Sequence, residues 1–356
     1  MTRKLLLLAC LVLAVFTWSA AAQPAPFTIM TQNMDAGTGL TYAIYGMLGY
    51  LDLPTGVELT YQEVQASDIP GRDALLAAQV AAKKPALLAL EEVVLWRTGD
   101  TTATATTVVA DHLRSLLASL AANGVPYDIV AVNTVSDLAL PKASGGVLRY
   151  TDRDALLVRA DLRPPDFHLS DVHTNIFDAA YSLGGVEVPA GWISAMVHLG
   201  NRNLRVLATH LQSPVEGDSA ATVAQMAQAQ QLLREARTST VPVVIVGDFN
   251  SDAILGVKGP GPDNTGVAAL FQGAGYADAW TLAGSGPGKT WPYYETDEFP
   301  PPPFCAQASP FERIDLILFQ GLAVLRAELV LAPGPNATTW PYYASDHAGL
   351  LATLQF

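Results

Sequence analysis

The sequence predicts a mixed α/β protein in which helices cover mixed β-sheets. Segments with the spacing of strands alternate with segments of helical periodicity along the chain. Apolar runs such as residues 241–246 are typical of strands that are buried on both faces. The sequence Gly200-Asn201-Arg202-Asn203 separates two further apolar runs and indicates a β-hairpin, so antiparallel pairs are expected beside parallel ones.

The expected helices have recognisable ends. A helix over residues 71–84 is stopped by Pro85, which cannot continue it. A second helix over residues 104–122 is closed by Asn123-Gly124, and a third over residues 218–237 is rich in Ala and Gln. Strands are expected at residues 27–32, 86–94, 127–133, 155–159, 192–199, 204–211, 241–246, 314–319, 327–331 and 349–356.

The N-terminus has the features of a secretory signal peptide. Two basic residues precede an apolar run over residues 5–16, and small residues follow it up to Ala22. The run is too short to favour a transmembrane anchor, and a lipoprotein role for Cys10 is the less favoured alternative. We therefore expect a signal peptide over residues 1–22, a secreted or periplasmic location, and one domain over residues 23–356.

Composition limits the function classes that remain. Removal of residues 1–22 takes away two positive charges, so the formal net charge changes from −13 to −15. This balance disfavours a basic groove that holds nucleic acid through phosphate contacts alone, but it allows an enzyme that binds one phosphodiester through a cation. Cys305 is the one cysteine beyond the expected signal peptide, so no internal disulfide is expected.

Polar residues that could carry chemistry lie where apolar strands end. They are Asn33, Glu91, Glu92, His210, Asp248, Asn250, Asp315, Asp346 and His347. Strand ends meet at one edge of a sheet, so we expect these side chains to converge. Their hard oxygen ligands suit Mg²⁺ or Mn²⁺, and the sequence has no Cys cluster or HExxH motif for zinc. Two histidines add an acid and a base, which together with a metal indicate phosphodiester hydrolysis.

Each motif taken alone has an ordinary structural explanation. The sequence Gly247-Asp248-Phe249-Asn250 is compatible with a tight turn, and His210 with a core histidine. Glu91-Glu92 is compatible with a helix N-terminus or a solvated edge, Arg313-Ile314-Asp315 with a cross-strand ion pair, and Ser345-Asp346-His347 with a cap or turn. Their occurrence together, in a fixed order and at strand ends, favours a functional site.

The order of these motifs resembles that of the endonuclease/exonuclease/phosphatase superfamily, which includes deoxyribonuclease I, apurinic endonucleases, neutral sphingomyelinases and inositol polyphosphate 5-phosphatases. The series is Gln32-Asn33, Leu90-Glu91-Glu92-Val93, Thr209-His210-Leu211, Gly247-Asp248-Phe249-Asn250, Arg313-Ile314-Asp315 and Ser345-Asp346-His347. The resemblance covers residues 27–356 and implies a four-layer α/β sandwich of two packed β-sheets with helices outside.

The resemblance also implies how the site binds metal and phosphate. Glu92, Asn33 and Asp346 match the family's metal-site residues, with one or two Mg²⁺ or Mn²⁺ ions left open. Asp248 and Asn250 match the pair that positions the phosphate and the attacking water, so Asn250 is expected to contact substrate as well.

The same resemblance implies the acid–base roles. His347 matches the histidine that activates water, and Asp315 matches the carboxylate that orients it. His210 matches the histidine that protonates the leaving oxygen. Arg153 lies where some members place a phosphate-binding arginine, and an edge-strand charge is its alternative explanation.

Two departures from the family pattern bear on the substrate. Glu91 stands where the family usually has Gln, and this extra carboxylate is expected to change metal affinity or to repel a polyanion. Residues 35–66 are irregular and rich in Gly, Tyr and Leu, so residues 37–61 are interpreted as an insertion that either lies over the cleft or is peripheral.

A secreted nuclease, acting on a phosphodiester of nucleic acid, is the first functional expectation. A sphingomyelinase-type phospholipid phosphodiesterase is second, because residues 291–304 could form an aromatic lip or a plain surface loop. A phosphomonoesterase and a non-catalytic binding protein follow, and the site residues disfavour the last of these. No stable protein partner is implied, so a monomer is expected.

The sequence TWPYY occurs twice, at residues 290–294 and 339–343. The second copy leads directly to the Ser345-Asp346-His347 motif, so we expect its aromatic side chains to pack beneath the loop that presents the catalytic base. The first copy has Thr296-Asp297-Glu298 in the corresponding place and carries no histidine. The sequence therefore predicts a chemical role for the second copy alone.

Overall fold

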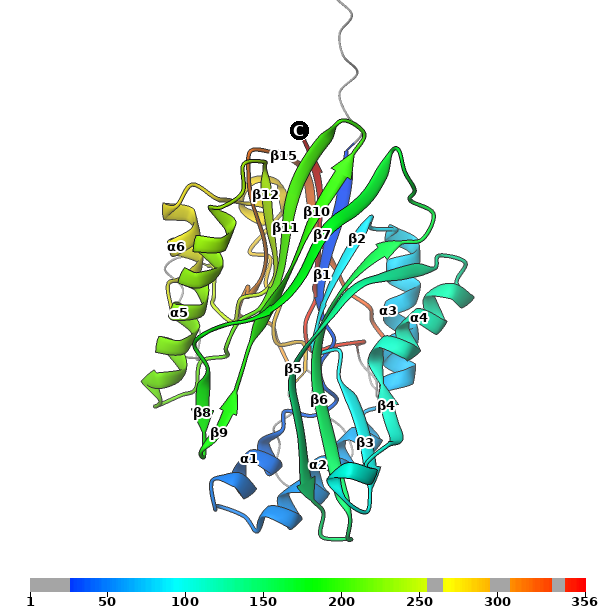
Figure 1. Ribbon diagram of the computed structural model, residues 1–356, viewed down its shortest axis with the longest axis vertical. Helices are drawn as coiled ribbons and strands as arrows, with labels where there is room; N and C mark the ends of the chain where they lie inside the picture. Colours follow the sequence, from blue (N-terminus) through cyan, green and yellow to red (C-terminus); the bar gives the residue numbers. More distant parts are fainter. Residues whose placement is uncertain (1–25, 255–264, 295–307, 335–342) are drawn as a thin grey trace, which may run out of the picture.

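Two β-sheets packed face to face form the centre of the protein (Figure 1). The computed structural model describes residues 26–254, 265–294, 308–334 and 343–356. Within these ranges the first sheet has eight strands, β1 (Phe27–Asn33), β2 (Leu87–Glu91), β3 (Leu95–Gly99), β4 (Thr107–Asp111), β5 (Tyr127–Pro141), β6 (Val147–Arg159), β15 (Ala323–Val330) and β16 (Gly349–Gln355).

The second sheet also mixes parallel and antiparallel pairs. Over the described residues it has six strands, β7 (Phe167–Ile176), β10 (Gly191–Leu199), β11 (Arg202–His210), β12 (Val243–Asp248), β13 (Ala277–Asp278) and β14 (Asp315–Gln320). Strand β12 is parallel to β11 and antiparallel to β14. In the first sheet, β1 is likewise parallel to β2 and antiparallel to β16. The predicted mixed sheets are therefore confirmed.

Helices cover the outer face of each sheet (Figure 1). Helices α3 (Ile69–Lys83) and α4 (His112–Ala122) pack on the first sheet, whereas α5 (Ser219–Ala236) and α6 (Val267–Gly273) pack on the second. Two further short helices are η1 (Thr102–Thr104) and α7 (Ala279–Ala283). The four layers are those that the family resemblance implies, and this expectation is confirmed.

The alternation of side chains along each strand produces this layering. Ile29 of β1 packs between the two sheets, whereas the next residue, Met30, packs against α3 with Leu76 and Val80. Successive strand residues point to opposite faces, so a strand that is apolar at every position serves both interfaces. Complete burial of one such side chain contributes about 1.5–3 kcal/mol to stability.

Residues 35–66 are more regular than the sequence analysis predicts. They contain α1 (Thr41–Met47) and α2 (Leu53–Ala66), which lie together at one end of the molecule (Figure 1). Asp52 caps α2 by accepting a hydrogen bond from the backbone N–H of Thr55, and Pro54 occupies the first turn. These are readable helix-start signals, which the irregular composition of the segment obscures.

The predicted helix over residues 104–122 is also corrected. Its first part forms strand β4, and α4 begins only at His112, with Asp111 as its N-cap. The sequence Thr107-Val108-Val109 is β-branched throughout, and such residues lose side-chain freedom in a helix and suit a strand.

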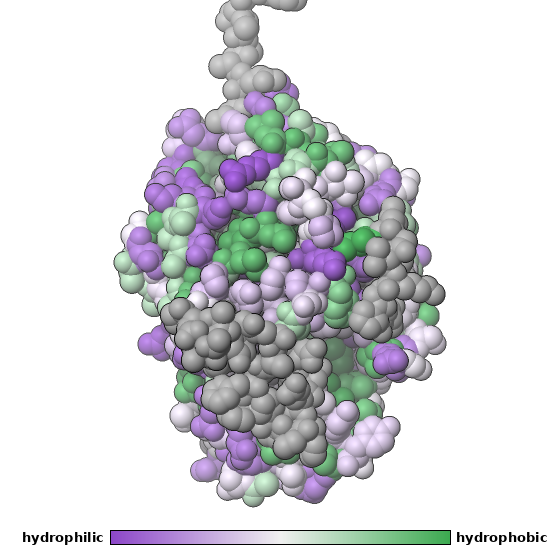
Figure 2. Space-filling view, turned by 180° about the vertical axis from the view of Figure 1, so that it is seen from behind, coloured by the Kyte–Doolittle hydropathy of each residue, from purple (hydrophilic) through white to green (hydrophobic). Residues whose placement is uncertain are grey.

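A small hairpin and the outer surface complete the description. Strands β8 (Tyr181–Leu183) and β9 (Val186–Val188) form a hairpin near the end of the molecule that α1 and α2 occupy (Figure 1). On the face seen in Figure 2, hydrophilic residues surround smaller hydrophobic areas. None of the helices in the described ranges combines the length and apolar character needed to span a bilayer.

Candidate active site

The register of the strands brings the predicted site residues together. His210 on β11 is the parallel partner of Asp248 on β12, and Asp248 is the antiparallel partner of Asp315 on β14. Asn33 ends β1 beside Glu91, the last residue of β2. Side chains from five strands therefore meet at one edge of the two packed sheets.

Unusual backbone conformations shape the strand ends. At Gly247 a Cβ atom would lie 1.8 Å from the carbonyl oxygen of Thr209, so only glycine allows β12 to pair with β11 at this point. Glu92 and Asn250, which follow β2 and β12, have φ values of 54° and 48°. Left-handed conformations of residues other than glycine cost on the order of 1–3 kcal/mol and concentrate at functional sites. Here they turn the side chains of Glu92 and Asn250 into the cleft.

Asn33 connects the two sheets through its side-chain amide. Its Nδ2 donates to Oε1 of Glu92 at 2.9 Å and to Oδ2 of Asp248 at 3.1 Å. Its Oδ1 accepts from the backbone N–H of Asp35 at 2.9 Å. The structure therefore places Asn33 as a residue that orients Glu92 and Asp248. The predicted role as a direct metal ligand would require the same Oδ1 that Asp35 uses.

His347 and Asp315, the predicted base and its orienting carboxylate, are in contact. Nδ1 of His347 lies 2.9 Å from Oδ2 of Asp315, and Nε2 lies 3.9 Å from Oδ2 of Asp248. His347 is only 8% exposed but lines the cleft. Burial favours the neutral ring, but Asp315, Asp346 and Asp248 outweigh it and hold the pKa of His347 well above its usual value. Because Asp315 accepts the Nδ1–H, Nε2 is the nitrogen that can take a proton from the cleft.

His210 lies on the other side of Asp248, with Nε2 3.6 Å from Oδ2. Burial lowers its pKa, but Asp248, Asp154 and other carboxylates outweigh burial and raise the pKa to about 9. Nδ2 of Asn250 lies 3.0 Å from Nε2 of His210, an arrangement that suits an unprotonated nitrogen. The same Nδ2 donates to the carbonyl oxygen of Leu211 at 2.9 Å, which fixes the orientation of this amide. Four carboxylates, those of Asp248, Asp154, Glu92 and Asp152, account for this raised pKa.

The first TWPYY copy supports the catalytic loop. Nε1 of Trp291 donates to Oδ2 of Asp346 at 3.0 Å, and Oγ1 of Thr290 accepts from the backbone N–H of Asp315 at 3.2 Å. The backbone N–H of Tyr293 donates to the carbonyl oxygen of Asp346. Of the second copy, residues 339–342 lie outside the described residues. The first copy thus supports the Ser345-Asp346-His347 motif, whereas the expectation that only the second copy has a chemical role stays a prediction.

Glu91 does not add a charge to the cleft. It is 1% exposed, and its carboxyl group accepts from Oγ1 of Thr31 at 2.9 Å. Burial, together with the charges of Asp315 and Asp154, raises its pKa well above the usual value. A protonated glutamic acid presents a donor group beside an acceptor oxygen, as the amide of Gln does. The expected repulsion of a polyanion by Glu91 is therefore not supported by this geometry.

Asp152 and Asp154 line the cleft, and sequence reasoning missed both. Burial and neighbouring carboxylates raise the pKa of Asp152 to about 6 and that of Asp154 well above its usual value. Arg153, between them, points elsewhere: it donates to the carbonyl oxygen of Val93 and to Asp111, each at 2.7 Å. Alternate residues of a strand face the same side, so β6 presents its two carboxylates to the cleft. The predicted substrate contact of Arg153 is thus corrected to an ion pair away from the cleft.

Arg72 is a third residue that the sequence did not indicate. It is fully buried in α3, and its guanidinium donates to the carbonyl oxygens of Met34, Asp35 and Ala344 at 2.6–2.9 Å. Its Nη1 also lies 3.4 Å from the carboxylate of Asp35. Arg72 thereby connects the segment after β1 to the segment that precedes Asp346 and His347.

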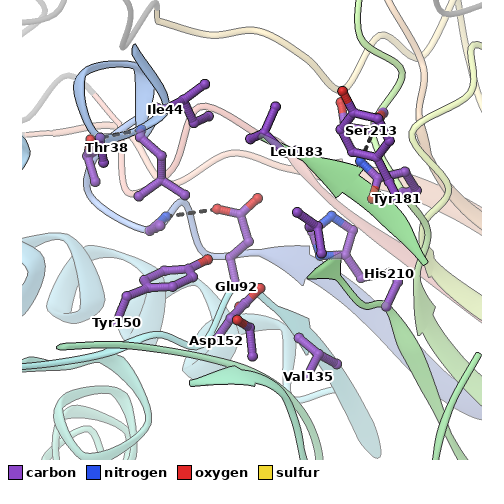
Figure 3. A pocket seen from close by; sticks show the side chains of 18 of the residues that line it. Thr38, Ile44, Glu92, Val135, Tyr150, Asp152, Tyr181, Leu183, His210 and Ser213 are labelled. Carbon is purple, nitrogen blue, oxygen red and sulfur yellow. Dashed lines mark hydrogen bonds between the residues drawn. The ribbon is translucent and has the colours of Figure 1, made fainter. Parts of the chain in front are cut away.

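Six of the predicted site residues line a cavity of about 490 Å³, whereas Asn33, Asp315 and Arg153 do not. Figure 3 shows Glu92, Asp152 and His210 on one side and Ile44 and Leu183 on the other. Asp248, Asn250, Asp346 and His347 line the same cavity. Residues 37–61, the predicted insertion, therefore lie beside the site, since Leu40, Ile44 and Val57 are among the lining residues.

The carboxylates of the cleft suit a divalent cation. Burial, followed by the charges of Asp35 and Glu92, raises the pKa of Asp346 to about 7. Among the described residues that line the cavity, none is Lys or Arg to balance this charge. One ligand atom each of Asp248, Asp315 and His347 also lie within 4.8 Å of one another, but their hydrogen bonding accounts for that grouping. Glu92 and Asp346 are the oxygen donors best placed to hold a hard cation at the cleft.

Fold and site together define a hydrolase of phosphoric ester bonds. A model of the Endonuclease/Exonuclease/phosphatase family matches residues 31–347, and the chain belongs to this family. The family generally depends on a divalent metal, in agreement with the carboxylate-rich cleft. No curated protein sequence matches this chain.

Several solved structures share the fold at low sequence identity. An endonuclease/exonuclease/phosphatase family protein from Bacteroides thetaiotaomicron is 14% identical and has a TM-score of 0.56. The match covers 94% of this chain and 99% of that protein's chain. D. rerio TDP2, complexed with a single-strand DNA product, is 13% identical and has a TM-score of 0.52. The match covers 93% of this chain and 100% of the TDP2 chain. A mannosyl-6-phosphatase from B. thetaiotaomicron is 13% identical and has a TM-score of 0.53. The match covers 93% of this chain and 100% of the phosphatase chain. These similarities show the fold alone.

Proposed function

We propose that this protein is an exported, divalent-metal-dependent phosphodiesterase. The observation that carries the proposal is the Asp315–His347 pair, in which Nδ1 contacts Asp315 and Nε2 faces Asp248 within the cleft. The features of a signal peptide in residues 1–22 support export. The carboxylates of Glu92 and Asp346 support Mg²⁺ or Mn²⁺ as the metal.

A cation held by Glu92 and Asp346 would neutralise the charge on the phosphate oxygens. His347 takes a proton from water at Nε2, and Asp315 keeps the ring in the required tautomer. The water oxygen forms a new bond to phosphorus as the bond from phosphorus to the leaving oxygen breaks. His210 donates its proton to that leaving oxygen, so one diester and one water yield a monoester and an alcohol.

Nucleic acid was the first substrate expected from the sequence, followed by a phospholipid and then a phosphomonoester. One structural neighbour is named as a complex with a DNA product, which is consistent with a nucleic-acid substrate. Another is named a mannosyl-6-phosphatase, which is consistent with a phosphomonoester substrate. Cleavage of a diester is the reaction that two histidines on either side of Asp248 suit best, since one can act as base and the other as acid.

An activity panel tests the proposal. The mature protein is incubated with bis-4-nitrophenyl phosphate, plasmid DNA, RNA and sphingomyelin, each with Mg²⁺ or with EDTA. We expect hydrolysis of at least the first substrate with Mg²⁺, loss of activity with EDTA and in His347→Ala, and full activity in His173→Ala. His173 is a matched control because it is exposed on β7 and outside the cleft. Activity that is unaffected by both EDTA and His347→Ala would contradict the proposal.

A further inference from the structure

The cavity continues beyond the catalytic residues as an apolar wall. We define this wall as Ile44, Met47, Leu138, Leu140, Leu183 and Val186, all of which line the cavity and are half-buried. They come from α1, β5 and the β8–β9 hairpin, which are separate parts of the chain. Figure 3 shows Ile44 and Leu183 facing Glu92 and His210 across the cavity. Apolar side chains that are grouped around a cavity and incompletely covered are typical of a ligand site.

The negative charge of the cavity disfavours a substrate with many successive phosphates. Its acidic lining residues include Glu92, Asp152, Asp154 and Glu187, and no Lys or Arg lines it within the described part of the chain. Of the internal segments outside that part, residues 295–307 and 335–342 contain no basic residue, and residues 255–264 contain only Lys258. Nucleic-acid binding draws most of its affinity from Lys and Arg on successive phosphates. A substrate with a single phosphate and an uncharged remainder fits this composition better.

The wall is held in place by fixed contacts at both of its sides. At Gly56 of α2, a Cβ atom would lie 2.2 Å from the carbonyl oxygen of Tyr42, so α1 and α2 pack at the closest possible distance. On the other side, the hydroxyl of Tyr181 donates to Asp218 at 2.8 Å and anchors the β8–β9 hairpin to the start of α5. A Cβ atom at Gly184 would lie 3.3 Å from the carbonyl oxygen of Met47, which shows that hairpin and insertion meet.

Apolar side chains also lie outside the wall on the same insertion. Tyr45, Leu48 and Tyr50 are 42%, 41% and 74% exposed, and the rings of Tyr45 and Tyr50 are in edge contact. Water-exposed aromatic and aliphatic side chains next to an apolar cavity suit contact with a long hydrocarbon chain as it enters.

We propose that the apolar wall binds an aliphatic chain esterified to the substrate phosphate, so that the substrate is a lipid-like phosphodiester. The proposal rests on the proposed phosphodiesterase function, because the chain must extend from a phosphate held near Glu92 and His347. Each methylene that the wall buries adds about 0.8 kcal/mol, which is about a fourfold gain in kcat/KM.

The test is a chain-length series of alkyl 4-nitrophenyl phosphate diesters with a common leaving group. The mature protein, with Mg²⁺, is given the methyl, butyl and octyl esters, each below the concentration at which it aggregates. We expect kcat/KM to rise about fourfold per methylene from methyl to butyl and then to level off as the wall is filled. Leu183→Asn is expected to lower kcat/KM for the octyl ester about tenfold and to leave the methyl ester unchanged.

Leu325→Asn is the matched control, because Leu325 is 52% exposed on β15, outside the cleft. It should leave the whole series unchanged. Equal kcat/KM for the methyl and octyl esters, with Mg²⁺-dependent turnover of both, would overturn the inference and leave the phosphodiesterase function standing. Turnover of none of the esters would overturn the phosphodiesterase function itself.

Discussion

The two ends of the cavity are built in different ways. The catalytic end is made by the strand ends of both sheets, where β-sheet register places His210, Asp248 and Asp315 side by side. The apolar end is made by α1, by Leu138 and Leu140 of β5 and by the β8–β9 hairpin. Helix α1 and this hairpin lie at one end of the molecule (Figure 1). The reaction is thus assigned to the strand ends, whereas the proposed contact with the substrate's chain also involves α1 and the β8–β9 hairpin.

The largest expected effect is at the catalytic end, on removal of the general base. His347→Ala should lower kcat by about 10²–10⁴-fold, because water then loses the group that accepts its proton. Steady-state kinetics on bis-4-nitrophenyl phosphate measure this loss, and circular dichroism checks that the fold is retained. A variant that keeps more than half of the wild-type kcat would assign the base to another residue.

Loss of the buried guanidinium behind the catalytic end should mainly affect stability. Arg72→Met leaves the buried carboxylate of Asp35 without its cation and three carbonyl oxygens without a donor. Breaking such a buried pair costs about 3–5 kcal/mol in the free energy of unfolding. Urea denaturation measures the change. A loss below about 1 kcal/mol would show that Arg72 does not hold the two segments together.

A smaller effect is expected for the tryptophan that supports Asp346. Trp291→Phe removes the hydrogen bond from Nε1 to Oδ2 of Asp346 and keeps most of the aromatic packing against Phe311. Loss of a residue that orients a metal ligand typically weakens metal binding about 10–100-fold. Activity measured against Mg²⁺ concentration should show this shift, with kcat near wild type at saturating Mg²⁺. An unchanged Mg²⁺ dependence would remove Trp291 from the metal site.

The smallest effect is expected at the exposed ion pair of Asp137 and Arg149, which joins β5 to β6 away from the reaction. The hydrogen bond from Arg149 lowers the pKa of Asp137, so the pair stabilises the fold above the unfolded pKa of about 3.9 and loses this contribution as pH falls through the lower folded pKa. Asp137→Asn should cost less than about 1 kcal/mol at pH 7. Thermal unfolding at pH 7 and pH 3 should show the difference from wild type shrinking at the lower pH. A difference that grows on acidification would reverse the sign of this coupling.

The sequence predicts the catalytic end better than its support. Asp248 and His210 follow or end apolar strands, so their approximate position can be read from local pattern. Asp152 and Asp154 could also have been predicted, since strand alternation places them on the face opposite Arg153. The contact of Arg72 with Ala344 could not be predicted, because it joins a helix to a backbone carbonyl 272 positions away and follows no local pattern.

The apolar end was the hardest part to predict. The composition of residues 37–61 predicts an insertion but contains no signal for the surface it covers. Its position depends on close packing of α1 on α2, which Gly56 permits, and on contact with a hairpin more than a hundred residues later in the chain. Such tertiary contacts become visible only in the folded protein.

One inhibition measurement tests most directly the claim that the two ends act on one substrate. Decyl phosphate and inorganic phosphate are compared as inhibitors of bis-4-nitrophenyl phosphate hydrolysis at constant Mg²⁺. We expect both to be competitive and decyl phosphate to have an inhibition constant at least about tenfold lower, because only its chain reaches the apolar wall. Equal inhibition constants for the two compounds would show that the apolar end takes no part in substrate binding.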